Sequence, residues 1–153
     1  NVTLFEVAIG PQSGEVDIHL SKKEDSSSLL PISKLQNEVF PGTGPVGTKT
    51  IRIEPLDCFL RHEDLVNPTL LKIDVQGYEL EALKGAQSLL SRIDYIYVEC
   101  SFIELYEGQS FAFDVIRYLD HHEFELIGEF NKVIDPTHGP VQADLLFKRL
   151  AAV

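Results

Sequence analysis

Hydrophobic and polar residues change their period in the middle of the chain. The residues from Leu70 to Ile73 are almost continuously apolar, which is typical of a buried strand. After the tetrapeptide at residues 74–77, apolar residues recur at helical spacing, at Leu80, Leu83, Ala86 and Leu90. This segment therefore predicts a strand, a tight turn and a helix, which together are half of a βαβ unit.

The first fifty residues show two strand patterns followed by a polar stretch. The run from Val2 to Ile9 is rich in β-forming residues, and the run from Val16 to Leu20 alternates strictly between apolar and polar residues. With the turn between them, these runs predict a β-hairpin near residues 7–20. Residues 21–50 are polar and rich in turn-forming residues, with little period of either kind. We expect them to form a long surface loop, which in a compact domain is more often functional or mobile than inert.

Strand and helix patterns alternate through the rest of the chain. Strands are predicted at residues 50–54, 95–98, 124–127 and 145–147, and an apolar stripe predicts a helix over residues 110–122. This order predicts an α/β fold with a parallel sheet, helices on its faces and a last strand that is antiparallel. The length of 153 residues, without an internal repeat, predicts a single domain over residues 1–153.

Charge and composition narrow the choice of partners. The formal net charge is −11, so the chain repels phosphate backbones and anionic headgroups, and we expect neither nucleic acid nor a membrane as a partner. No apolar run approaches the roughly 20 residues that span a bilayer, and no signal segment opens the chain. Cys58 and Cys100 lie in apolar segments and predict two reduced, buried thiols. These features favour a cytoplasmic protein and leave its oligomeric state open.

Two acidic residues follow strands that are predicted to be neighbours. Asp74 comes after the strand at residues 70–73, and Glu99 comes after the strand at residues 95–98. Because ligands bind outside the carboxyl ends of strands in open parallel sheets, we expect both carboxylates along one rim of a ligand site. Glu79 lies in the first turn of the following helix, where an acid also complements the helix dipole, and Asp74 could instead cap that helix. The three carboxylates could hold Mg²⁺, but their spacing is not diagnostic and we assign no metal site.

Several segments of the chain resemble those of FkbM-type methyltransferases. They are LKIDVQGYE at residues 71–79, LKGA at 83–86, LYEG at 105–108, VAIG at 7–10, LD at 56–57 and QADLLF at 142–147. Their order and spacing agree with that family over almost the whole chain. The family is similar in fold to the class I, Rossmann-like methyltransferases. These enzymes hold S-adenosylmethionine with a glycine-rich first strand–helix turn and an acid after the second strand.

The resemblance implies that the chain is a fragment. It makes the run from Val2 to Ile9 the third strand, so the first two strands and the glycine-rich cofactor motif are expected upstream, in agreement with the lack of any methionine. The cofactor contacts that remain by this resemblance are the adenine wall at Ala8 and Ile9, and Asp74 near the methyl group. We therefore expect the fragment alone to bind S-adenosylmethionine weakly and to be inactive.

The resemblance also implies O-methylation of a hydroxyl on a sugar or a secondary metabolite. Asp74 is then the candidate that orients or deprotonates the hydroxyl, and Glu79 and Glu99 are the other catalytic candidates. Gln76 stands where the family usually has an acid. This difference gives some support to an alternative, a non-catalytic α/β module that binds a protein or glycan partner. A Mg²⁺-dependent phosphotransfer or hydrolase domain is a third possibility.

Overall fold

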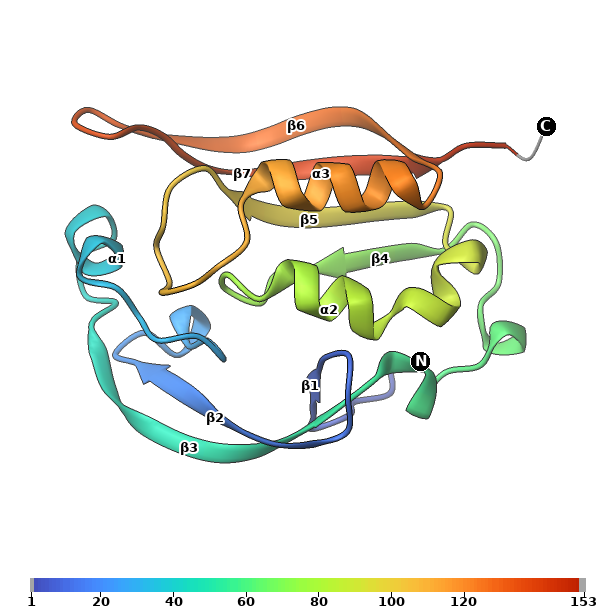
Figure 1. Cartoon of the computed structure of the whole chain (residues 1–153), viewed down its shortest axis with the longest axis horizontal. Coiled ribbons are helices and arrows are strands. Elements are labelled where there is room, and N and C mark those ends of the chain that lie inside the picture. The colour runs from blue at the N-terminus through green and yellow to red at the C-terminus, as the bar shows by residue number, and fades with distance from the viewer. Residues whose placement is uncertain (1, 152–153) are drawn as a thin grey trace.

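Two β-sheets and three α-helices are formed by residues 2–151, the part of the chain that the computed structural model describes (Figure 1). The three-stranded sheet has the order β1-β3-β2 and contains β1 (Ala8–Ile9), β2 (Gly14–Ser21) and β3 (Pro45–Glu54). The four-stranded sheet has the order β4-β5-β7-β6 and contains β4 (Leu70–Ile73), β5 (Tyr95–Ser101), β6 (Phe124–Asp135) and β7 (Gly139–Arg149). The helices are α1 (Lys34–Val39), α2 (Glu79–Gly85) and α3 (Ala112–His121), with 3₁₀ turns at residues 24–26, 56–58, 62–64 and 87–92. Helix α2 contacts strands of both sheets.

The four-stranded sheet is mixed, and β7 lies between β5 and β6. β4 and β5 pair in parallel, with Leu70 opposite Tyr95, whereas β7 is antiparallel to both of its neighbours, β5 and β6. The short turn that joins β6 to β7 requires this antiparallel pairing. Alternate residues of β7 are fully buried: Val141, Ala143, Leu145 and Phe147. The predicted α/β class and the antiparallel last strand are confirmed.

The predictions of one parallel sheet and of a hairpin near residues 7–20 are wrong. The strands form two mixed sheets, and β1 covers only two residues. β1 pairs in parallel with β3, while β2 pairs antiparallel with the other edge of β3, with Val16 opposite Ile51. β3 is ten residues long and can pair along the whole of β2, so it takes the place that was predicted for residues 2–9.

The prediction of a long loop over residues 21–50 is also wrong. The segment contains a 3₁₀ turn, helix α1 and the first half of β3. Helix α1 begins after Ser33, whose Oγ accepts a hydrogen bond from the backbone N–H of Gln36 at 3.2 Å. The first six residues of β3 are exposed, so they lack the alternation of apolar and polar residues that marks a half-buried strand.

Two apolar cores hold the molecule together. The larger core lies between the four-stranded sheet and helices α2 and α3, and includes Leu83, Ile96, Leu119 and Phe147. The smaller core contains Ile32, Leu105, Tyr106 and Val141, with apolar residues of α1 packed against it. This second core attaches the segment around α1 to the edge of the sheet where β4 and β5 end (Figure 1).

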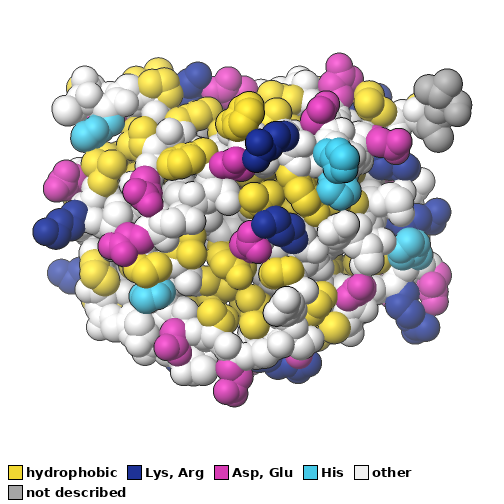
Figure 2. Space-filling model, viewed as in Figure 1, with side chains coloured by type: hydrophobic (Ala, Val, Ile, Leu, Met, Phe, Trp, Pro, Cys, Tyr) yellow, Lys and Arg dark blue, Asp and Glu magenta, His cyan; other side chains and the backbone are white. Residues whose placement is uncertain are grey.

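Apolar side chains reach the surface over α2 and β1 and also over α3 and β6, with charged side chains scattered among them (Figure 2). Cys100 is buried as predicted, but Cys58 is exposed because the 3₁₀ turn that carries it lies on the surface.

Within residues 2–151, we find no helix with the length and apolar character that crossing a bilayer requires.

Candidate functional site

The turn between β4 and α2 has a backbone that depends on Gly77. Gly77 has φ +93°, and Gln76 before it has φ +53°, so both residues lie in the left-handed region. A Cβ at position 77 would lie 3.1 Å from side-chain atoms of Tyr106 and 3.2 Å from Cβ of Gln109. Glycine is therefore required here for both its conformation and its small size. This tight turn brings the end of β4 close to the loop that follows β5.

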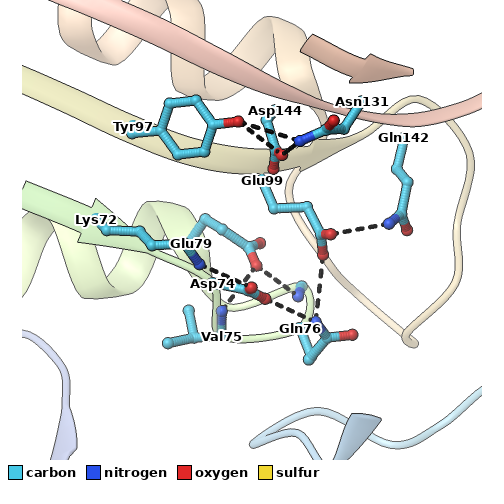
Figure 3. Close-up of polar contacts among 11 residues, drawn as sticks. Lys72, Asp74, Val75, Gln76, Glu79, Tyr97, Glu99, Asn131, Gln142 and Asp144 are labelled. Carbon is cyan, nitrogen blue, oxygen red and sulfur yellow. Dashed lines mark hydrogen bonds and ion pairs between the residues drawn. The ribbon is translucent and has the colours of Figure 1, made fainter. Parts of the chain in front are cut away.

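Glu79 stabilises this turn from inside the protein. Its side chain is buried, and Oε1 accepts hydrogen bonds from the backbone N–H groups of Gly77 at 2.9 Å and Val75 at 3.3 Å (Figure 3). Burial raises the pKa of Glu79 from its usual 4.5 to about 7, although the backbone donors oppose the shift. Glu79 lines neither of the two cavities described below. Its contacts are those of a residue that closes the turn.

Gln76 brings the carboxylates of Asp74 and Glu99 together. Its Nε2 donates to Oδ1 of Asp74 at 2.8 Å and to Oε2 of Glu99 at 3.2 Å (Figure 3). The hydroxyl of Tyr106 donates to Oε1 of Gln76 at 2.8 Å, and Gln142 on β7 donates to Oε1 of Glu99 at 2.8 Å. Glu99 lies within β5 rather than after it. The two acids nevertheless share one rim, as the sequence predicts.

The surroundings of Glu99 change the acidity of its carboxyl group. Burial raises the pKa of Glu99 to about 7, and the negative charges of Asp74, Glu79 and Asp144 act in the same direction. Asp74 is partly exposed and forms an ion pair with Lys72 at 2.9 Å. Glu99 therefore exchanges a proton near neutral pH beside an acid that has its own cation, which suits a general acid or base.

A cavity of about 290 Å³, here called the acidic cavity, opens beside these residues. The end of β4, β5 and β7 supply one wall, with Asp74, Gln76, Glu99 and Gln142. The segment before β3 supplies the facing wall, with Lys23, Asp25, Ser26, Gln36, Phe40 and Thr43. The cavity thus combines carboxylates, amides and hydroxyls with one cation and one aromatic ring.

A second cavity, here called the apolar cavity, has about 270 Å³ and lies on the other side of Asp74. Its lining comes from β1, β4 and α2 and is mostly apolar: Ile9, Leu56, Leu71, Ile73, Val75, Ala82 and Ala86, with Lys72 and Asp74. Of the predicted cofactor residues, Ile9 and Asp74 meet in this cavity, whereas Ala8 is not part of its lining. Asp74 lines both cavities and so lies at their boundary.

Several residues of the acidic cavity were not singled out from the sequence. Ser33 and Gln36 have the spacing of a capping box, which could have revealed α1 and with it the second wall. No local signal marks Gln142, because only the pairing of β5 with β7 brings it to Glu99. Across residues 2–151, no group of three or more His, Cys, Asp or Glu side chains is arranged to hold a metal ion.

Comparison with known proteins gives matches along most of the chain. The family model described as "Methyltransferase FkbM domain" matches residues 1–126. The 2-O-methyltransferase NoeI of Sinorhizobium fredii is 31% identical over 141 residues, which cover 86% of this chain and 56% of that protein. The hexuronic acid methyltransferase AglP of Haloferax volcanii is 34% identical over 53 residues, which cover 35% of this chain and 22% of that protein. The chain thus spans about half the length of NoeI, and no solved structure matches it.

Proposed function

The chain belongs to the FkbM methyltransferase family, and from this premise we propose that it serves in methyl transfer from S-adenosylmethionine to a hydroxyl of a sugar or a related secondary metabolite. The names of the two relatives, a 2-O-methyltransferase and a hexuronic acid methyltransferase, support this class of acceptor. The observation that carries the proposal is the position of Asp74 at the boundary between an apolar cavity and a polar one.

The apolar cavity is the proposed cofactor side. Ile9, Leu71 and Ala82 offer apolar surface for the adenine ring or the methylene groups of S-adenosylmethionine, and Asp74 places a negative charge at the edge of the cavity. A carboxylate there attracts a sulfonium cation, so the residues present fit this part of the cofactor. When bound, S-adenosylmethionine supplies an electrophilic methyl group.

The acidic cavity is the proposed acceptor side. Asp74 accepts a hydrogen bond from a second hydroxyl of the acceptor, next to the one that reacts, and so holds the reacting oxygen toward the boundary between the cavities. Glu99, whose pKa is raised to about 7, takes the hydroxyl proton in its ionised form. Gln76 keeps the two carboxylates at a fixed separation, because its amide donates to both. We assign Glu79 to stabilisation of the turn rather than to the reaction, on the basis of its backbone contacts.

A methyl-transfer assay on the full-length protein tests the proposal. With S-adenosylmethionine carrying a labelled methyl group and a panel of hydroxyl acceptors, we expect Asp74→Asn to lower kcat by about 100-fold or more. Asp120→Asn is the matched control, since Asp120 is exposed on α3, and should retain the rate of the unmodified protein.

Two results would contradict the proposal in different ways. Full activity of Asp74→Asn would remove Asp74 from the reaction. Absence of methyl transfer to every hydroxyl acceptor, with the protein folded, would instead favour the non-catalytic binding module. Gln76 supports that second candidate, because its amide occupies the site between the two acids.

A further inference from the structure

Gln36 carries a buried polar group that no side chain or backbone group satisfies. Its side chain is only 3% exposed, and its Oε1 accepts no hydrogen bond from the residues that the structure describes. Its backbone is fully used: the N–H donates to Oγ of Ser33 at 3.2 Å, and the carbonyl accepts from the N–H of Phe40 at 2.9 Å. The backbone thus holds the residue in place, while the amide oxygen is left for another partner.

The position of this amide connects it with the candidate site. Gln36 lines the acidic cavity, opposite the wall that carries Asp74, Gln76 and Glu99. Buried polar groups in proteins nearly always have a hydrogen-bond partner, and exceptions need an explanation. For an unsatisfied acceptor at the wall of a ligand cavity the explanation is direct, since a ligand that carries a hydroxyl would supply the missing donor.

We propose that Gln36 recognises the acceptor of the methyl group by accepting a hydrogen bond from one of its hydroxyls, and that this acceptor is an uncharged sugar ring. The inference rests on the proposed function and adds the recognition wall to it. Phe40 lies on the same wall and offers its ring to the apolar face of a sugar. The volume of about 290 Å³ is near the lower end of the roughly 300–1,000 Å³ of typical ligand pockets, which suits one sugar ring.

The charges of the cavity select against an anionic sugar. Asp25, Asp74 and Glu99 contribute three carboxyl groups to the lining, against one cation from Lys23. A hydroxyl donates to the oxygens of these carboxyl groups, so a neutral sugar satisfies the cavity better than a uronate.

Binding experiments on the full-length protein test the role of Gln36. The probes are methyl α-D-glucopyranoside, which is neutral, and methyl α-D-glucopyranosiduronate, which carries a carboxylate. We expect the unmodified protein to bind the neutral glycoside more tightly in titrations followed by NMR. Gln36→Met has nearly the same shape without the amide and should bind the neutral glycoside about fivefold more weakly. Gln87→Met is the matched control on an exposed part of the chain and should bind normally.

The melting temperature separates a recognition role from a structural one. If the amide of Gln36 serves only a ligand, Gln36→Met removes an unsatisfied buried group, and its Tm should equal or exceed that of the unmodified protein. Gln36→Asn is a second variant that keeps the amide but shortens its reach, and it should lose binding in the same way.

Each other outcome overturns the inference. Unchanged binding by both variants, or a clear fall in Tm for Gln36→Met, would make Gln36 a structural residue. Tighter binding of the uronate, or binding of neither glycoside by the unmodified protein, would exclude a neutral sugar. The assay needs no turnover, so normal glycoside binding without any methyl transfer would contradict the proposed function and leave the role of Gln36 standing.

Discussion

Replacement of Glu79 by glutamine should stabilise the protein at high pH and leave it unchanged at low pH. The buried carboxyl has its pKa raised from 4.5 to about 7, so the folded state binds this proton more tightly than the unfolded chain does. A tenfold change in proton affinity corresponds to about 1.4 kcal/mol, so ionisation of Glu79 costs the folded protein about 3 kcal/mol once the pH is well above 7. Below about pH 4.5 the carboxyl is protonated in both states and this cost vanishes.

Glutamine keeps the contacts of Glu79 and removes its charge. Its amide oxygen can accept the same hydrogen bonds from Val75 and Gly77, because Oε1 is an acceptor in both side chains. Loss of the charge also relieves Glu99, whose pKa the charge of Glu79 helps to raise. Both effects act in the same direction, so the difference in unfolding free energy between Glu79→Gln and the unmodified protein should grow from near zero at about pH 4.5 to about 3 kcal/mol at about pH 8.

Urea unfolding of both proteins at several pH values measures this difference. Because the two proteins share every other titrating group, the difference isolates position 79 and its neighbours. A constant difference across the pH range would refute the reasoning, since it would mean that folding does not shift the pKa of Glu79. A variant that is less stable at about pH 8 would show that the charged form is favoured by the turn.

Three other changes in and around the site have expected outcomes. Gln76→Glu puts a third carboxylate about 3.2 Å from Glu99. Two charges at this distance repel each other by about 5 kcal/mol at an effective dielectric constant of about 20. The Tm of this variant should therefore fall more at about pH 8 than at about pH 5, and equal falls at the two pH values would contradict this. Gly77→Ala should lower the unfolding free energy in urea by at least ~1 kcal/mol more than Gly108→Ala, because both positions have positive φ but only Gly77 has close neighbours. The rate of methyl transfer should rise as the pH passes about 7, where Glu99 becomes ionised. Glu99→Gln should lose this rise. If the rise survives the substitution, another group is responsible for it.

The sequence predicts those elements whose own pattern agrees with their packing. The strand at residues 70–73 and the helix after it are predictable because their apolar residues face the main core, and the antiparallel last strand follows from the short turn before β7. Helix α1 and the first half of β3 escape prediction for the opposite reason. α1 has only six residues, and the first half of β3 is exposed, so neither carries a strong period of its own.

The residues of the candidate site likewise differ in whether a local pattern in the sequence predicts them. Asp74 and Glu99 could be predicted to share a rim because parallel neighbouring strands end at the same edge. Gln142 could not, because its contribution depends on the pairing of segments far apart in the chain, and for Gln36 the only local signal is its capping-box spacing from Ser33. The role of Gln76 was likewise hidden: its departure from the family pattern was visible, but its bridge between two acids requires coordinates.

The hydrogen bonds of Gln76 also join the two walls of the acidic cavity. The hydroxyl of Ser28 donates to the backbone carbonyl of Gln76 at 2.6 Å, and the hydroxyl of Tyr106 donates to its side chain. A chain of hydrogen bonds thus runs from the segment that carries the recognition wall, through Gln76, to the carboxylate of Glu99. Thermodynamic reciprocity then requires that a sugar which shifts the titration of Glu99 be bound with an affinity that itself varies with pH, by the same free energy in either direction.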